Sequence, residues 1–241
     1  MLSIVVPAYD EEARLGGTLA RLVEFFGARS ETWEVIVADD GSCDRTAAIT
    51  LEWAERDARV RLVRLPKNRG KGAAVRAGVR ASVGDLVLFS DADLATPIEE
   101  LDKLRARIDD GYDVAIGSRA LGDSDIVVRQ HPARELMGRT FNLVVRALFL
   151  GGIRDTQCGF KLFRGDVARE IFAAAQIDGF AFDVEILRLA RERHRIAEVP
   201  VVWRHVEQSK VSPGIDAARM LRDVLILRLR GPRRKPRRDN T

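Results

Sequence analysis

Residues 86–93 read Leu86-Val87-Leu88-Phe89-Ser90-Asp91-Ala92-Asp93. The apolar run has the length of a buried strand, and two carboxylates separated by one residue follow it. At a strand end, both carboxylates can reach a hard cation and the phosphate ligands of that cation. An isolated Asp-x-Asp triplet is a weak signal, because acidic pairs are also common in solvated loops and helix caps. Other parts of the sequence are needed to distinguish a metal site from a simple turn.

This stretch is part of a regular alternation of two kinds of segment. Short apolar runs predict strands at residues 3–7, 34–38, 60–65, 85–89 and 113–116. Segments with helical spacing lie between them, at residues 11–26, 44–56, 72–81 and 97–109, with Thr96 as the expected N-cap of the last. The alternation predicts an α/β fold, with a mostly parallel, Rossmann-like sheet flanked by helices.

The pattern loosens after about residue 118. There we expect helices at residues 133–150, 166–175, 182–193 and 214–229, and strands at residues 160–163 and 196–203. The length favours a single domain over residues 1–229. Residues 1–117 would form its nucleotide-binding half and residues 118–229 its acceptor-binding half, and a basic tail at 230–241 is expected to be disordered.

Polar residues follow three of the predicted strands. They are Tyr9-Asp10-Glu11, Asp39-Asp40-Gly41-Ser42 and Asp91-Ala92-Asp93. In open α/β sheets the ligand crevice lies at the carboxyl ends of the strands, so these clusters should converge on one edge. Their convergence favours a metal site at the third cluster. Asp39 can accept from a base or ribose; the alternative is a simple turn, with Asp44 capping the next helix.

The loop Asn68-Arg69-Gly70-Lys71-Gly72 joins a predicted strand to a helix. Glycines allow close backbone approach, a helix N-terminus offers N–H groups, and Lys71 adds charge, which together suit a phosphate. The competing interpretation is a tight turn with a solvated lysine. The first strand is not followed by Gly-x-Gly-x-x-Gly, which disfavours a dinucleotide oxidoreductase.

The positive charge of the chain is concentrated at its C-terminal end. Seven of the 40 basic residues lie between Arg228 and Arg238, and the remaining 33 face 36 acidic residues, which gives the body a net charge of −3. A nucleic-acid-binding protein would be expected to have a basic folded face, so no nucleic-acid partner is expected. Two cysteines, and no signal peptide or membrane-spanning run, predict a cytoplasmic protein.

Four of the runs above resemble glycosyltransferase family 2, of the GT-A fold. They are residues 5–12, 37–42, 68–72 and 91–94. In the second half, residues 117–119, 155–161, 182–185, 198–201 and 209–210 resemble the dolichyl-phosphate glucosyltransferases and related polyprenyl-phosphate mannosyl- and glucosyltransferases. The resemblance implies an inverting transfer of a hexose from UDP- or GDP-sugar to the phosphate of a polyprenol, with Mg²⁺ or Mn²⁺.

The resemblance also implies residue roles. Asp91 and Asp93 would bind the metal and the diphosphate, and the donor site would comprise Pro7, Tyr9, Glu11, Asp39, Asp40, Lys71, Asp91, Ala92 and Asp93. Mannosyltransferase relatives have a glutamine two places after the second aspartate, where this chain has Ala95. That departure favours UDP-glucose over GDP-mannose.

Basic residues are the candidates for holding the acceptor phosphate, because a lipid phosphate is already an anion and needs neutralisation rather than a strong base. By resemblance they are Arg119, Arg134, Arg204 and Lys210, and the alternative for each is an ordinary surface residue. The catalytic group would comprise Asp93, Arg119, Asp155 and Gln157, with Asp155 and Gln157 facing the sugar or the reaction centre.

The last predicted helix suggests a contact with a membrane. Leu221, Leu225 and Leu229 share one face, and the basic tail follows. Such a helix suits the interface of an anionic leaflet, which predicts a peripheral protein at the cytoplasmic face of a membrane. The alternative is a helix packed on the domain. Two other functions stay open: transfer to a soluble glycan or small molecule, and a non-catalytic nucleotide-sugar-binding module that docks on membranes.

Overall fold

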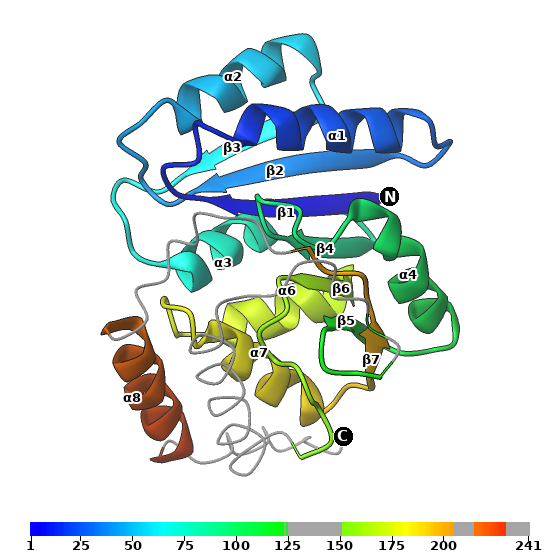
Figure 1. The fold of residues 1–241 in the computed structure, drawn as a ribbon, viewed down its shortest axis with the longest axis vertical. Helices are drawn as coiled ribbons and strands as arrows, with labels where there is room; N and C mark the ends of the chain where they lie inside the picture. The colour runs from blue at the N-terminus through cyan, green and yellow to red at the C-terminus, as the bar shows by residue number, and fades with distance from the viewer. Residues whose placement is uncertain (123, 125–150, 205–214, 230–241) are drawn as a thin grey trace, which may run out of the picture.

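The computed structural model describes residues 1–122, 124, 151–204 and 215–229, with the side chains of residues 215–218 excepted (Figure 1). Within these ranges a seven-stranded sheet has the order β3-β2-β1-β4-β6-β5-β7. Its strands are β1 (Leu2–Ala8), β2 (Trp33–Asp39), β3 (Val60–Arg64), β4 (Leu86–Ser90), β5 (Val114–Ser118), β6 (Phe160–Arg164) and β7 (Ile196–Pro200). Only β6 runs antiparallel to its neighbours, so the expected mostly parallel α/β sheet is confirmed.

The helices follow the predicted pattern with shifted ends. They are α1 (Leu15–Gly27), α2 (Thr46–Arg56), α3 (Lys71–Ala81), η1 (Ile98–Glu100), α4 (Leu101–Asp109), α6 (Gly165–Ala174), α7 (Phe182–Arg191) and α8 (Ile215–Leu229). The expected helix over 133–150 lies outside the described residues.

Two local expectations were wrong. Thr96 does not cap a helix, because its hydroxyl lies 3.8 Å from the Cys158 sulfur and the first helical turn begins only at Ile98. The first helix begins at Leu15 rather than at residue 11. Asp10 takes a positive φ of 50°, and the Glu11 amide donates to the Thr46 hydroxyl at 2.7 Å. Residues 10 and 11 therefore form a turn that precedes α1.

The strands are apolar on both sides because helices cover both faces of the sheet (Figure 1). Val5, Val87 and Phe89 point into a core with α3, α6, α7 and α8. Ile4, Val6 and Leu88 point into a second core with α1 and α4. Successive residues of a strand face opposite sides, so an uninterrupted apolar run such as Leu86–Phe89 serves both cores.

The antiparallel strand β6 lies between β4 and β5. Its partner register pairs Ser90 with Phe160 and Leu86 with Arg164. The start of β6 therefore lies beside the carboxyl end of β4, where Asp91 follows. This insertion brings a segment from the second half of the chain to the edge where the acidic clusters lie.

The final helix α8 packs on the domain and still leaves an apolar face exposed. Val224 and Leu227 are buried in the core with α3, α6 and α7. Leu221, Leu225 and Leu229 remain 44%, 50% and 86% exposed, one turn apart along the helix. None of the helices in the described part of the chain combines the length and apolarity needed to cross a bilayer.

Candidate active site

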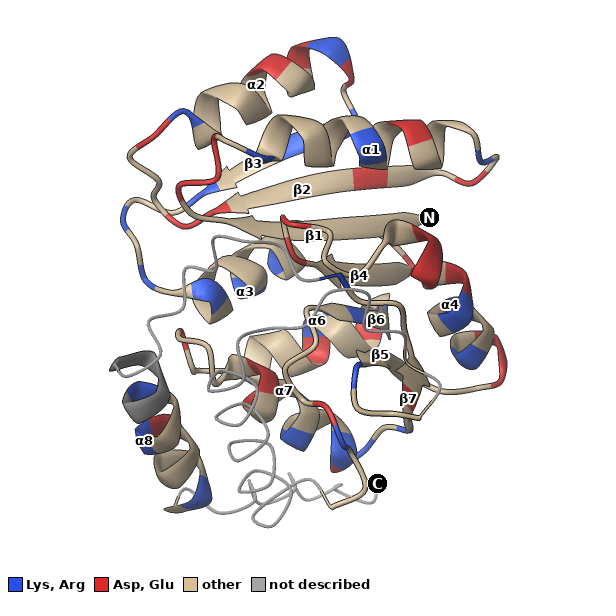
Figure 2. Ribbon diagram, viewed as in Figure 1, with Lys and Arg blue, Asp and Glu red and all other residues tan. Residues whose placement is uncertain are grey.

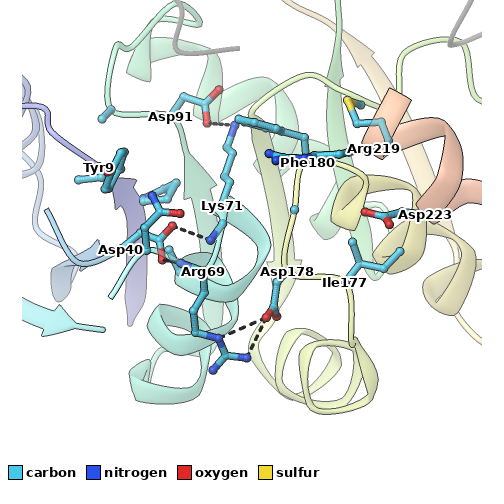
Figure 3. Close-up of a pocket in the computed structure, with 18 of the residues that line it drawn as sticks. Tyr9, Asp40, Arg69, Lys71, Asp91, Ile177, Asp178, Phe180, Arg219 and Asp223 are labelled. Atoms are coloured by element: carbon cyan, nitrogen blue, oxygen red, sulfur yellow. Dashed lines mark hydrogen bonds and ion pairs between the residues drawn. The ribbon is translucent and has the colours of Figure 1, made fainter. Parts of the chain in front are cut away.

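A cavity of about 980 Å³ opens at the carboxyl edge of the sheet (Figure 3). One wall is formed by residues that follow strands β1, β2 and β4: the acidic residues Glu11, Asp40, Asp91 and Asp93, together with Tyr9. The start of α3 forms a second wall. The loop 176–180 and α8 close it from the other half of the chain. The convergence expected from three separate strand ends is therefore present in the structure.

Asp91 and Asp93 follow β4 in a tight turn. The Leu94 amide donates to the Asp91 carbonyl at 3.2 Å, and Leu94 itself takes a positive φ of 45°, a conformation that a branched residue seldom adopts. One carboxylate oxygen of Asp93 accepts from the Ala95 amide at 3.0 Å. Burial, and then the neighbouring Asp91 carboxylate, raise the pKa of Asp93. The turn thus holds two like charges close together, an arrangement that a bound cation would relieve.

Lys71 is the first residue of α3 and points across the cavity to Asp91 (Figure 3). Its ammonium lies 2.7 Å from Asp91 Oδ1 and 5.3 Å from the centre of the Phe89 ring. Burial alone would lower the pKa of Lys71, but the carboxylates of Asp91 and Asp183 outweigh it and the pKa is raised. Lys71 is therefore a firmly charged cation on the cavity wall.

Asp40 organises the loop that carries Lys71. Its two carboxylate oxygens accept from the amides of Arg69 and Gly70 at 2.9 and 2.7 Å. The amides of Ala73 and Ala74 donate to the Gly70 carbonyl. The amides of Arg69, Gly70, Ala73 and Ala74 are thus engaged within the protein. Of the loop proposed for phosphate contact, Asn68, Arg69, Gly70 and Lys71 line the cavity, and Lys71 brings its charge to it.

Asp39 lies outside the cavity lining, although it was predicted to contact the nucleoside. It is fully buried, accepts from the Ser42 amide at 2.9 Å, and lies 3.0 Å from Arg64 Nε. Its role as a nucleoside contact stays a prediction. The remaining predicted donor residues, Pro7, Tyr9, Glu11 and Ala92, all line the cavity.

Arg119 and Asp155 form a two-pronged ion pair with each other. Arg119 Nε and Nη2 donate to the two oxygens of Asp155 at 2.7 and 2.9 Å, and the Arg119 amide adds a third bond at 3.0 Å. Burial would raise the pKa of Asp155, but Arg119 outweighs it and the pKa is lowered. An ionised carboxylate of this kind is a weak proton acceptor, so the geometry favours Asp155 as the group that orients Arg119.

The other predicted site residues are dispersed. Gln157 is half-buried beside the Arg119–Asp155 pair, and its backbone N–H donates to Asp155 Oδ1 at 3.1 Å. Arg204 is exposed next to a smaller hollow near Leu94, with its own amide bonded to the Ala95 carbonyl at 2.8 Å. Arg134 and Lys210 lie outside the described residues. Neither Arg119 nor Arg204 lines the large cavity.

Sequence reasoning missed the wall made by the loop 176–180. Asp178 in this loop pairs with Arg69 at 2.8 Å (Figure 3). It also pairs with Arg76, so it connects the loop both to the residues before α3 and to α3 itself. The amides of Gln176 and Ile177 donate to the buried Glu185 carboxylate at 2.8 and 2.7 Å. An Asp-Gly pair between two helical patterns marked a turn at this place. Nothing in the local sequence indicated which distant arginines it would meet.

The donor set suits a hard cation of the Mg²⁺ or Mn²⁺ type. Asp91 and Asp93 offer carboxylate oxygens on one cavity wall. No cluster of three or more His, Cys, Asp or Glu side chains with metal-binding geometry occurs among the residues that the structure describes. Two carboxylates, with water and substrate phosphate completing the shell, are the usual protein site for such a cation.

Solved structures of a glucosyl-3-phosphoglycerate synthase have a similar fold. Glucosyl-3-phosphoglycerate synthase from Mycobacterium tuberculosis, in complex with Mn²⁺, UDP and glucosyl-3-phosphoglycerate, matches with a TM-score of 0.70 at 20% identity, over 96% of this chain and 81% of that one. The chain therefore has the GT-A fold, and its acidic cavity lies at the carboxyl edge of the sheet.

The chain belongs to glycosyl transferase family 2, whose family profile matches residues 3–172. Two relatives lie close to it in sequence. The dolichyl-phosphate beta-glucosyltransferase of Dictyostelium discoideum is 38% identical over 95% of this chain and 74% of its own length. The human protein of the same name is 37% identical, over 95% and 75% respectively. The sequence resemblance to this family is confirmed.

Proposed function

We propose that this enzyme transfers glucose from UDP-glucose to the phosphate of a polyprenol, with inversion and with the help of Mg²⁺ or Mn²⁺. The observation that carries the proposal is the cavity in which Asp91, Asp93 and Lys71 meet at the end of β4. It is supported by relatives named dolichyl-phosphate beta-glucosyltransferase, which match along 95% of the chain.

On the donor side, Asp91 and Asp93 would hold the cation, which neutralises charge on the departing diphosphate. Lys71 lies within reach of the same region and would add a second positive charge. Tyr9, at the end of β1, offers an aromatic face on the cavity wall for the base. The leaving UDP takes the electron pair of the bond to the anomeric carbon.

On the acceptor side, an oxygen of the lipid phosphate forms the new bond to the anomeric carbon from the face opposite UDP. The phosphate is already ionised at neutral pH, so no protein base has to remove a proton. Arg119, held by Asp155 outside the lining of the large cavity, would orient this phosphate, and Asp155 already balances its charge. That role suits an arginine whose guanidinium is fixed in place before the substrate arrives.

A donor and acceptor assay tests the proposal. Purified enzyme is offered UDP-glucose, UDP-galactose, GDP-mannose or UDP-N-acetylglucosamine, each with a polyprenyl phosphate and either Mg²⁺ or Mn²⁺. We expect glucosyl lipid from UDP-glucose, a loss of at least about 100-fold in rate for Asp93→Asn, and none for Gly17→Ala on the exposed side of α1. Preferential use of GDP-mannose would reject the glucosyl assignment. Full activity of Asp93→Asn would reject the metal site.

We also propose that α8 holds the enzyme at the cytoplasmic surface of an anionic membrane. The exposed stripe Leu221, Leu225 and Leu229 lies on the helix that forms one cavity wall. Arg222 and Arg228 are exposed on the same helix. Figure 2 shows basic residues on α8. Apolar insertion beside cations is the chemistry of an interfacial helix, and it would bring the cavity to the lipid acceptor.

Vesicle flotation tests the membrane contact. With phosphatidylglycerol-containing vesicles, we expect the binding of Leu221→Ser/Leu225→Ser to fall at least about tenfold, because two inserted side chains are lost. Leu51→Ser removes an equally exposed leucine from α2 and serves as the control. Binding that neither salt nor the α8 substitutions weaken would exclude α8 as the contact.

A further inference from the structure

Gly159 faces the Asp91 carboxylate directly. The β4–β6 register pairs Ser90 with Phe160, and one step further the Asp91 amide donates to the Gly159 carbonyl at 3.0 Å. Opposed residues of an antiparallel pair place their side chains on the same side. A Cβ built on residue 159 would overlap the carboxylate of Asp91.

The requirement at residue 159 is space and not backbone conformation. Gly70 in this site takes a φ of +119°, in the region that favours glycine, whereas Gly159 lies outside that region. An alanine at 159 is therefore compatible with the local chain path. It could be accommodated only if the Asp91 carboxylate or the start of β6 moved.

A buried ion pair fixes the backbone at this point. Lys161 on β6 is fully buried, and its ammonium donates to the Cys158 carbonyl at 2.6 Å and pairs with Asp183 from the first turn of α7. The same ammonium lies 5.5 Å from the Phe89 ring, which Lys71 approaches to 5.3 Å. Lys161 thus holds the carbonyl that immediately precedes Gly159.

A buried ion pair contributes little net stability to a core, because removing two charges from water costs free energy. An apolar pair of similar volume is often as stable or more so. The Lys161–Asp183 pair therefore calls for an explanation beyond stability. Its ammonium is tied to the backbone beside the Asp91 carboxylate, and that geometry supplies one.

We infer that Gly159 and the Lys161–Asp183 pair are positioning residues for Asp91: the pair fixes the start of β6, and Gly159 leaves the space that the carboxylate occupies. Asp91 then meets the cation in one orientation, with its other side toward Lys71. The inference rests on the proposed role of Asp91 as a metal ligand. Groups that orient a metal ligand typically change metal affinity about 10- to 100-fold when they are removed.

The test measures binding of Mn²⁺ directly. Free Mn²⁺ is followed by electron paramagnetic resonance in the presence of UDP, and UDP binding is measured separately by calorimetry in EDTA. We expect Gly159→Ala to weaken Mn²⁺ binding about 10- to 100-fold while UDP binding in EDTA stays within about twofold of wild type. Gly17→Ala has open space around its new methyl group and should behave like wild type in both measurements.

A second variant guards against a folding defect. Lys161→Met/Asp183→Leu replaces both charges by apolar groups, which keeps the core filled. We expect it to unfold cooperatively in urea and to bind Mn²⁺ at least about tenfold more weakly. Wild-type Mn²⁺ affinity in this variant would mean that the pair serves stability alone and would overturn the inference. If Gly159→Ala does not fold, this variant decides.

Asp91→Ala separates the two levels of the argument. If it retains wild-type Mn²⁺ affinity, the proposed metal site itself is wrong. If it loses Mn²⁺ while Gly159→Ala and the double variant bind normally, the metal site stands and the positioning role is rejected.

Discussion

At the scale of single residues, the site depends on charges that hold one another in place. Asp155 is 2% exposed and accepts three hydrogen bonds from Arg119. Asp40 accepts two backbone amides, and Asp178 pairs with two arginines. Each carboxylate fixes a neighbouring segment rather than facing a substrate alone. A sequence motif that counts acidic residues cannot separate these positioning roles from direct contacts.

Asp155→Asn should lower the free energy of unfolding by about 2 kcal/mol at pH 7, because a charge-assisted pair becomes a neutral one. The pKa of Asp155 is lowered in the folded protein, so its stabilisation is present above the unfolded-state pKa of about 4 and is lost as pH falls through the folded value. Urea unfolding at pH 7, 5 and 3.5 should therefore show a gap between wild type and variant that is constant at first and then narrows. A gap that widens toward acid would contradict this account.

At the scale of elements, α3 lies very close to the sheet. A Cβ on Gly78 would overlap Val5 Cγ1 and lie 3.2 Å from the Cβ of Ala38, so the helix rests almost on the backbone of β1 and β2. The same helix begins with Lys71, whose ammonium lies 2.7 Å from Asp91 Oδ1.

Gly78→Ala should destabilise the protein by about 1–3 kcal/mol, because the added methyl group overpacks the core. Replacing a helical glycine that has free space should instead be neutral or stabilising, since alanine favours the helix by up to about 1 kcal/mol. Gly17 on α1, which has nothing within 4 Å, provides that control. Urea midpoints of the two variants give the comparison, and equal effects at both positions would refute it.

At the scale of the whole molecule, the two halves of the chain interlock. Among the described strands, β5 from the first half pairs with β6 and β7 from the second and with no strand of its own half. The cavity likewise takes its acidic wall from the first half, and the loop 176–180 and α8 from the second. We therefore do not expect residues 1–117 to fold as an independent nucleotide-binding unit.

Residues 1–117 expressed alone should fail to give a cooperative unfolding transition, because β5 would lack both partners and β4 would expose an edge. Circular dichroism during a urea titration of the fragment and of residues 1–229 measures this. A sharp transition in the fragment, at a midpoint near that of the longer chain, would show that the first half is an independent domain.

Much of this architecture could be predicted from the sequence, for reasons that are local. The strand of residues 86–90 and the helix of residues 71–81 show their type in the spacing of their own apolar residues. The convergence of Tyr9, Asp40 and Asp91 also followed, because parallel strands joined by right-handed crossovers end at the same edge. Exact helix starts did not follow, since Asp10 and Thr96 are engaged by residues distant in sequence.

The sequence by itself determined the class of fold, the acidic edge and the family of the enzyme, because these depend on short-range pattern and motif. Only the tertiary structure decided that β6 runs backwards between β4 and β5, that Arg119 belongs to Asp155, and that Asp91 lies over Gly159. These are contacts between residues 36 to 78 positions apart. They depend on how whole helices and strands pack against one another. In a closely packed interior, the Asp91 carboxylate fits because residue 159 is a glycine and has no side chain.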